Sequence, residues 1–447
     1  MSTSDLSGLN VALYGVQDDL RDSVHFLRAI TQLAANSRVI AHKAIYTDKG
    51  IKLVEGGARI HSRLYDSLVQ APLREAIDNH LMVDTMVSVA SIEAEALVQC
   101  ETMPWLQRAV QALGGAGRLL APVRSMPLST PIAFKLTLMR EQRPAFYAHS
   151  LQLMLVALYL GVESGWSERE CVPLAVAGLL HDIGMLYLPP SWTDPEYRLR
   201  PEERKQLIAH SVTGMHILRA EALYPLSVSL AVLEHHERMD GSGYPRGLQG
   251  EEISPMGQIL MLAEVVAAFH EKYAQTAGPR LSLMLRMNHR HYPAALVRII
   301  LPLLGSEVDT DLDMGQVRRE VQTMGDWLEQ RFAQWLQLCA QGSAQPPSPP
   351  LGDAVQWLDT RLKDLQKELA QTGSHPQQLA DLLESLQDDS QGMGELALLH
   401  HEALWQLGSI ADECLRRWPQ LLAPSGPLAT DLANWCLACT GPVPASA

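Results

Sequence analysis

The sequence is poor in cysteine and in positive charge. Its 447 residues include six cysteines, which are too few for a disulfide framework in a chain of this length. Lys and Arg together number 36 against 50 Asp and Glu, so the net charge is −14. This acidity disfavours a general DNA- or RNA-binding surface, although it leaves room for one small phosphate ligand held by a few local Lys or Arg side chains.

Two kinds of hydrophobic segment are also missing. The N-terminal residues Met1 to Asp5 form no basic stretch and no apolar stretch follows them, so we expect no signal peptide. No apolar run approaches the roughly 18 residues that cross a bilayer, so we expect no membrane span. Together these absences predict a cytoplasmic protein. The length of the chain predicts two or three domains.

The sequence does contain histidines and carboxylates grouped in an ordered string. One segment, Leu179–Gly184, contains an adjacent His and Asp, and a second segment some fifty residues on, Glu234–Pro245, contains an adjacent pair of His. Two single histidines, His149 and His210, precede and separate these segments. Imidazole nitrogens and carboxylate oxygens without thiolates favour iron, manganese or a similar ion over a structural zinc of the cysteine type.

The adjacent His181 and Asp182 restrict how a metal could be bound. Neighbours on a regular helix do not face the same way, so both reach metal only if they point at different ions or lie where a helix ends. Gly184 follows two residues later, which is typical of a helix end. A carboxylate can also bridge two ions, one oxygen to each, so Asp182 is the natural bridge of a two-metal centre. Such centres polarise a water for in-line attack on a phosphoester.

Taken in order, these residues resemble the HD-GYP family, a branch of the HD phosphohydrolases whose members hydrolyse the bacterial second messenger cyclic di-GMP. The resemblance runs from about Ala145 to Tyr273, under a third of the chain. The motifs that carry it are His149, the pair His181 and Asp182, the H-x-x-x-G of His210 and Gly214, the triplet His235, His236 and Glu237, and the Asp-Gly-x-Gly-Tyr-Pro loop of residues 240–245.

The resemblance implies two divalent transition-metal ions, with iron or manganese expected, and Asp182 as the catalytic residue that both share. The ligands of one ion would be His149, His181, Asp182 and Glu264, where Glu264 stands at the position of a family Asp. The ligands of the other would be Asp182, His210, His235 and His236. The substrate-binding residues would be Gly241, Gly243, Tyr244, Pro245 and Lys272.

Besides Glu264, the sequence departs from the family at several other positions. Met185 replaces a Lys that helps to balance phosphate charge, Ala267 replaces a second Asp, and Gln258 replaces an Arg. Ala145 replaces a Glu that binds a third ion in some members, so we expect two ions and not three. Three functions stay open: a metal-dependent cyclic di-GMP phosphodiesterase, a module that binds metal or nucleotide and signals through partner contacts without turnover, and a hydrolase of another nucleotide.

The periodicity of the whole chain predicts a mainly α fold. We expect an all-α HD-type catalytic domain at residues 130–305, between a small α+β N-terminal region at 1–125 and a helical C-terminal extension at 306–341. A separate helical region follows at 353–447. In the N-terminal region, the turn signal Asp48–Gly50 predicts a hairpin of Ile45–Tyr46 with Ile51–Val54. In the last region, a leucine stripe near 3.5 spacing predicts a short coiled coil or a bundle face; it comprises Leu358, Leu362, Leu365 and Leu369.

The expected small-molecule partner is cyclic di-GMP or a related nucleotide. Contacts of a protein partner with the N- or C-terminal helical regions, and a homodimer, stay open. The triplet His400-His401-Glu402 repeats the motif of the catalytic segment, but no His-Asp pair precedes it and no glycine loop follows. We therefore expect no metal site at this second triplet.

Overall fold

The computed structural model describes residues 23–61, 64–70, 72–194, 197, 199–273, 277–288, 290–304, 313–342, 349–371, 374–424 and 426–441. The first 22 residues of the expected N-terminal region, residues 306–312 of the expected extension and residues 343–348 lie outside these ranges. The chain divides into two compact units. The first comprises residues 1–274 and 289–303, and the second comprises residues 275–288 and 304–447. The finer division into four segments stays a prediction.

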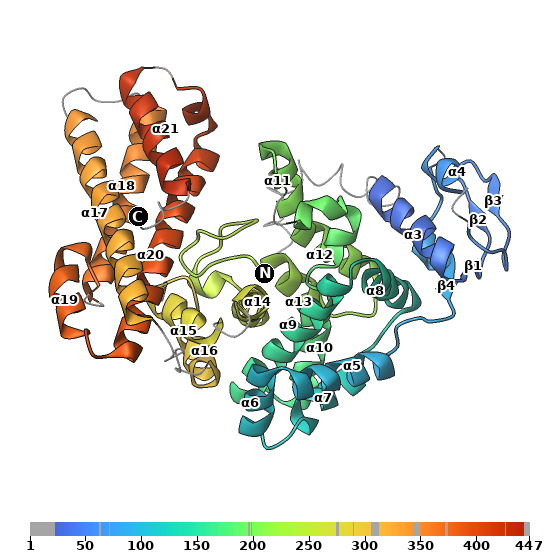
Figure 1. Ribbon diagram of the computed structural model, residues 1–447. Helices are drawn as coiled ribbons and strands as arrows, with labels where there is room; N and C mark the ends of the chain where they lie inside the picture. Colours follow the sequence, from blue (N-terminus) through green and yellow to red (C-terminus); the bar gives the residue numbers. More distant parts are fainter. Residues whose placement is uncertain are drawn as a thin grey trace. The chain divides into compact units, whose positions relative to one another are not determined.

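The mainly α fold is confirmed, and the strands lie in the N-terminal region (Figure 1). Strand β2 (Ile45–Tyr46) pairs antiparallel with β3 (Lys52–Val54), which is the hairpin predicted around Asp48–Gly50. A second pair, β1 (Val39–Ala41) with β4 (Leu81–Val83), was not predicted because its strands are forty residues apart. The helices that accompany these strands are α3 (Val24–Asn36), α4 (Tyr65–Gln70) and the 3-10 helix η2 (Ile77–His80).

The rest of the first unit is helical. Helices α9 (Pro144–Glu163), α10 (Glu168–Leu180), α13 (Leu226–Glu234) and α14 (Pro255–Tyr273) pack against one another around a shared core. Further helices surround them: α5 (Val89–Thr102), α6 (Pro104–Ala112), α7 (Gly117–Arg124), α8 (Thr130–Gln142), α11 (Pro201–Ile208), α12 (His210–Ala220), α16 (Ala294–Ile300), and the 3-10 helices η3 (Ile183–Tyr187), η4 (Pro190–Thr193), η5 (Gly250–Glu252) and η7 (Leu301–Leu303).

Two helical segments of this unit are longer and more apolar than the sequence led us to expect. Pro144–Glu163 and Glu168–Tyr187 each contain an 18-residue window with the length and hydropathy of a membrane span, which corrects the expectation that no run approaches this limit. In each case 78% of the window is buried inside the unit. A helix covered by neighbours on every side is apolar all round, so burial in the core explains this composition.

Helix α10 begins at a capping box and ends directly before the His-Asp pair. The Ser167 hydroxyl accepts from the Glu170 backbone N–H, while the Glu170 carboxylate accepts from the Ser167 N–H at 2.8 Å, which completes a capping box. The helix ends at Leu180, and η3 starts three residues later. His181 and Asp182 therefore lie at the junction between two helices, where adjacent side chains can point in different directions.

The second unit is a helical bundle. Its helices are α15 (Ala277–Met287), α17 (Met314–Gly342), α18 (Pro349–Gln371), α19 (Leu379–Ser385), α20 (Ser390–Arg417) and α21 (Pro427–Thr440), with 3-10 helices η8 (Pro376–Gln378) and η9 (Pro419–Leu422). Helices α17, α18, α20 and α21 pack side by side (Figure 1). The leucine stripe of α18 is buried in their common core with Trp327 and Trp335. It is therefore a bundle face.

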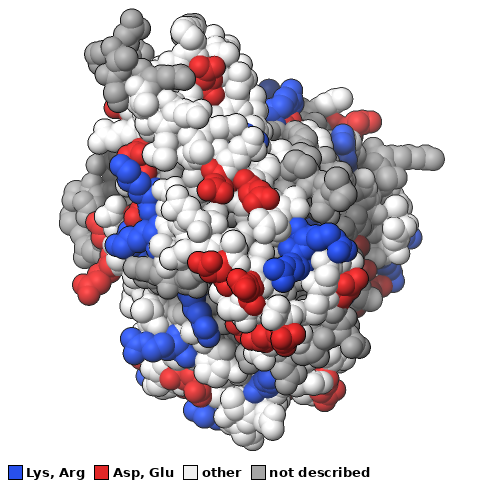
Figure 2. Space-filling model, turned by 60° about the vertical axis from the view of Figure 1, so that its left-hand side comes forward, with Lys and Arg blue, Asp and Glu red and all other residues white. Residues whose placement is uncertain are grey.

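The surface carries both signs of charge. On the face in Figure 2, acidic and basic side chains are interspersed and separated by neutral surface. A mixed face of this kind gives no extended positive field for a polyanion on the part of the surface that is drawn and described. The expectation that the chain binds no DNA or RNA stays a prediction.

Candidate metal centre

The histidines of the motif come from the ends of helices that pack together. His149 lies in the second turn of α9, and His181 and Asp182 follow α10. His210 begins α12, and His235 follows α13 directly. Because α9, α10, α12, α13 and α14 are neighbours, residues spread from position 149 to 264 reach one buried place.

Two groups of donor atoms form there. In the first, one atom each of His149, His181 and Glu264 lie within 4.8 Å of one another. In the second, the same limit holds for Asp182, His210, His235 and His236. All seven residues that the sequence predicts as metal ligands are thus brought together.

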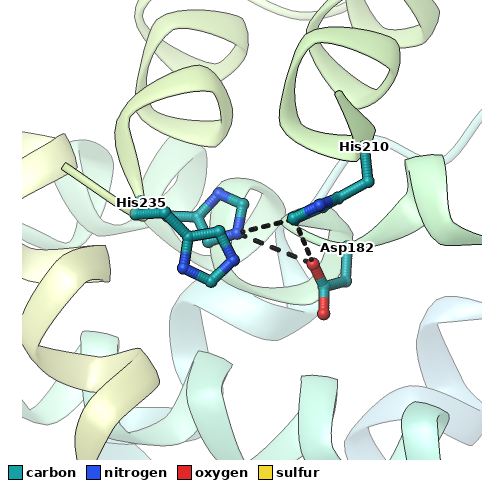
Figure 3. A group of neighbouring side chains, drawn as sticks. Asp182, His210 and His235 are labelled. Carbon is teal, nitrogen blue, oxygen red and sulfur yellow. Dashed lines mark hydrogen bonds and ion pairs between the residues drawn. The ribbon is translucent and has the colours of Figure 1, made fainter. Parts of the chain in front are cut away.

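The two oxygens of Asp182 face different groups. Oδ2 lies 3.2 Å from His181 Nε2, whereas Oδ1 lies 3.1 Å from His210 Nε2 and 3.6 Å from His235 Nε2. Figure 3 shows the carboxylate of Asp182 with His210 and His235 converging on one of its oxygens. On the other side, Glu264 Oε2 lies 3.1 Å from His149 Nε2 and 3.4 Å from His181 Nε2. Asp182 therefore stands between the two groups.

Three of the rings are held in one orientation by their own helices. His181, His210 and His235 each place Nδ1 against the carbonyl oxygen three residues earlier, at 2.9, 2.5 and 2.6 Å. A carbonyl only accepts, so Nδ1 carries the hydrogen and, in the neutral ring, Nε2 keeps its lone pair. His210 Nε2 and His235 Nε2 then face each other at 3.3 Å. Such an arrangement fits a cation between lone pairs.

Buried atoms without partners support the same fit. Among the described residues, His181 Nε2 and Asp182 Oδ1 are buried and have no well-aligned hydrogen-bond partner. A polar atom buried in this way costs free energy unless something satisfies it. Nitrogen and oxygen donors without thiolate are suited to a divalent transition metal. The cluster therefore has the donor set of a divalent-metal site.

The charges of the cluster are strongly coupled. Burial lowers the pKa of His181, but the carboxylates of Asp182 and Glu264 outweigh burial and raise it to about 9. Burial raises the pKa of Asp182, yet His181 and the hydrogen-bonding His210 hold it well below its ordinary value. Burial and the neighbouring rings of His235 and His210 lower the pKa of His236. The carboxylates thus require positive charge beside them, which a divalent cation would also supply.

The glycine-rich loop after His236 is fixed by two buried carboxylates. Glu237 accepts from the backbone N–H groups of Arg246 and Leu248 at 2.8 and 3.0 Å. Glu234 accepts from the Ser254 N–H at 2.9 Å and pairs with the Arg246 guanidinium. The sequence predicted Glu237 only as part of the motif and gave no role to Glu234. Both residues hold the loop beside the cluster of histidines and carboxylates.

The residues predicted to bind substrate lie in different settings. The ring of Tyr244 packs on His236 with centroids 4.7 Å apart, and its N–H donates to the His236 carbonyl. Gly243 lies against the backbone of Glu237 and Arg238, where a Cβ would clash, and Gly241 has a φ of 79°. Pro245 follows Tyr244 in a cis peptide bond. Lys272 is exposed near the end of α14, with Nζ 5.0 Å from the Tyr273 ring.

Three of the positions that depart from the family pattern are buried or hydrogen-bonded within the protein. Met185 is only 4% exposed within η3, and Ala267 is buried in α14. The Gln258 amide donates to the carbonyl oxygen of Ile253 at 3.1 Å. In the second triplet, His400 is buried in α20 and directs Nδ1 at the Leu396 carbonyl. The expectation of no metal at His400 stays a prediction.

Comparison with known proteins agrees with these features. Residues 136–296 match the HD domain family model. The chain is 32% identical over 162 residues to the cyclic di-GMP phosphodiesterase PdeB of Borreliella burgdorferi, covering 35% of this chain and 42% of that protein. It is 38% identical over 104 residues to a cyclic di-GMP phosphodiesterase of Thermotoga maritima, covering 23% and 28%. It is 33% identical over 123 residues to the 3′3′-cGAMP-specific phosphodiesterase 1 of Vibrio cholerae, covering 27% and 28%.

The helical core, the His-Asp junction and these matches define an HD domain at residues 136–296. With its His-His-Glu triplet and Gly-Tyr-Pro loop, this domain carries the motifs of the HD-GYP branch and is similar to the cyclic di-GMP phosphodiesterases named above. The chain spans less than half the length of the relatives named above.

Proposed function

We propose that this chain is a metal-dependent phosphodiesterase that hydrolyses cyclic di-GMP in bacterial signalling. The observation that carries the proposal is the placement of Asp182, whose two oxygens face two separate groups of donors at 3.1 to 3.6 Å. A carboxylate in this position suits a bridge between two ions. We assign His149, His181 and Glu264 to one ion, and His210, His235 and His236 to the other, with Asp182 shared. Iron and manganese fit the donors.

Each part of the site has a distinct task in this proposal. When bound, two divalent ions supply charge that activates water and stabilises the phosphoester as it is attacked. Asp182 holds its oxygens toward both groups because it lies at the junction of α10 and η3. Glu234 and Glu237 keep the glycine loop close to His236, and Tyr244 offers an aromatic face at the same place. The site can therefore combine phosphate chemistry with packing against a flat nucleobase.

The relatives support a cyclic dinucleotide as the substrate class. Two of those named act on cyclic di-GMP and one on 3′3′-cGAMP, by their names. These substrates differ in one base, so the fold alone does not separate them. We place cyclic di-GMP first because it is the named substrate of both the longest match and the most identical one of the three.

The test is metal analysis and hydrolysis with the purified full chain. The protein should carry close to two iron or manganese ions per chain. It should open cyclic di-GMP to a linear product, whose formation is measured by chromatography. Cyclic di-GMP and 3′3′-cGAMP are compared at equal concentration, and faster turnover of the second would transfer the proposal to that substrate. Protein from metal-replete medium that binds no ion would refute the site.

One observation favours the second candidate function, a module that binds nucleotide and signals without turnover. Met185 and Gln258 place no cation in the region where the family has Lys and Arg, and both side chains are engaged in the protein. Binding of cyclic di-GMP without hydrolysis, under iron and manganese alike, would replace the first proposal with this one.

We also infer that the terminal regions contact protein partners or a second copy of the chain, and that the protein works in the cytoplasm. Supporting the first point, the second unit exposes several large apolar side chains, namely Leu336, Trp405, Leu422 and Leu437. Of these, Trp405 is of a residue type that is enriched at protein interfaces relative to the rest of the surface. Sedimentation of the full chain over a range of concentrations would test for the homodimer.

A further inference from the structure

We propose that Glu271 is a positioning residue of the metal centre, which orients His149 and thereby sets the affinity of the ion in the group of His149, His181 and Glu264. The inference rests on the proposed two-ion centre and adds a residue to it. Neither the sequence pattern nor the two donor groups include Glu271.

The ring of His149 is held differently from those of the other oriented histidines. His181, His210 and His235 direct Nδ1 at a carbonyl of the preceding turn. The buried Nδ1 of His149 instead faces Glu271 Oε2 at 3.3 Å. The contact has the separation of an ion pair but lacks the alignment of a good hydrogen bond. Contacts of this kind can tighten when a site is loaded.

The placement of Glu271 follows from helix α14. Glu264 and Glu271 are seven residues apart, which is close to two helical turns, so both lie on the face that packs along α9. Glu264 contacts Nε2 of His149 at 3.1 Å, and Glu271 contacts Nδ1. The imidazole thus lies between two carboxylates from a single helix. Glu271 is 54% exposed, so it stands at the rim of the centre.

The chemistry of a metal-bound imidazole gives this contact its effect. When Nε2 binds an ion, Nδ1 carries the hydrogen and donates it to a partner that fixes the ring and raises the basicity of the ligand nitrogen. A carboxylate is a stronger acceptor than a carbonyl because it is charged. Loss of such a partner typically lowers metal affinity about 10- to 100-fold. Glu271 should act on the ion at His149 and leave the ion at His210 unaffected.

The experiment measures Mn²⁺ binding to the metal-free full chain, with free Mn²⁺ followed by electron paramagnetic resonance. The wild type should bind two ions. Glu271→Ala should lower the affinity for one ion about 10- to 100-fold and leave the affinity for the other unchanged. Glu271→Gln keeps an acceptor oxygen and should restore part of the loss. Glu163→Ala, which removes an exposed carboxylate at the far end of α9, should bind both ions like the wild type.

The outcomes separate the two proposals. If the wild type binds two ions and Glu271→Ala binds both with unchanged affinity, Glu271 has no positioning role and the inference is overturned. If Glu271→Ala lowers the affinity for both ions equally, the effect comes from the loss of one negative charge near the site and not from the orientation of His149. The proposed positioning role is then also overturned. If the wild type binds fewer than two ions, the two-ion centre fails and the inference fails with it. Equal unfolding temperatures of the metal-free proteins would exclude misfolding as the cause of a selective loss.

Discussion

Gly184 lies directly against the backbone carbonyl of His210. A Cβ on Gly184 would overlap that oxygen and would come within 2.9 Å of the Gly214 backbone nitrogen. This contact lets η3 lie on α12, and it keeps Asp182 Oδ1 at 3.1 Å from His210 Nε2. The glycine of the His-Asp segment thus serves close packing of two backbones.

Gly184→Ala should therefore disturb the metal centre as well as the fold. Because the obstacle is backbone, the methyl group must push η3 away from α12, and the Asp182 carboxylate moves with it. We expect Mn²⁺ affinity to fall at least about 10-fold, as for other losses of ligand orientation. Gly117→Ala is the control, since a Cβ there meets open space at the start of α7. Equal Mn²⁺ affinity in both variants would contradict the packing argument.

Asp182→Asn tests the bridge. Asn has the same size but no negative charge and only one oxygen, so both ions should bind more weakly and hydrolysis should stop. Metal content by elemental analysis and turnover of cyclic di-GMP are the measurements. Retention of both ions with full turnover would show that Asp182 is no bridge.

His400→Ala is the matched comparison for Asp182→Asn. It removes a buried imidazole from α20, in the second unit. The cavity should lower the unfolding temperature, while metal content and turnover stay as in the wild type. The pair of variants thus distinguishes loss of stability from loss of metal.

The N-terminal region should influence the centre through Phe26. The rings of Phe26 and Tyr187 stack with centroids 4.6 Å apart, and Tyr187 is the last residue of η3. Phe26→Ala removes a buried ring, which typically costs about 3–5 kcal/mol, and should loosen η3 next to Asp182. Thermal unfolding and Mn²⁺ affinity should both decrease. Tyr46→Ala, at an exposed position of the same region, should change neither, and normal Mn²⁺ affinity in folded Phe26→Ala would exclude the link.

Met185→Lys should destabilise the chain and should not restore a phosphate contact. Met185 is almost fully buried, and burial lowers the pKa of a lysine below its usual value of about 10.4. The loss of stability should be largest below the lowered pKa and should shrink as pH rises from there toward the unfolded-state value. Urea unfolding at pH 7 and 9.5 measures this. Met185→Leu should cost less than about 1.5 kcal/mol. Wild-type stability at pH 7 together with faster turnover would contradict the prediction.

Much of the local structure was determined by the sequence alone. The capping box of Ser167 and Glu170 fixed the start of α10, and the change from helix to His-Asp-x-Gly marked its end. The turn at Asp48–Gly50 gave the hairpin, and the histidine string identified the family before any contact was known. These signals work because helix ends, tight turns and ligand types depend on residues a few positions apart.

Tertiary packing alone decided the relationships across the centre. That the two oxygens of Asp182 face separate groups, that Glu271 faces His149, and that Met185 is buried all depend on how α9, α10, α12 and α14 pack. The spacing of Glu264 and Glu271 placed them on one face of α14 but could not show which helix that face meets. Contacts between residues about a hundred positions apart are set by the fit of whole apolar faces, and no local pattern encodes that fit.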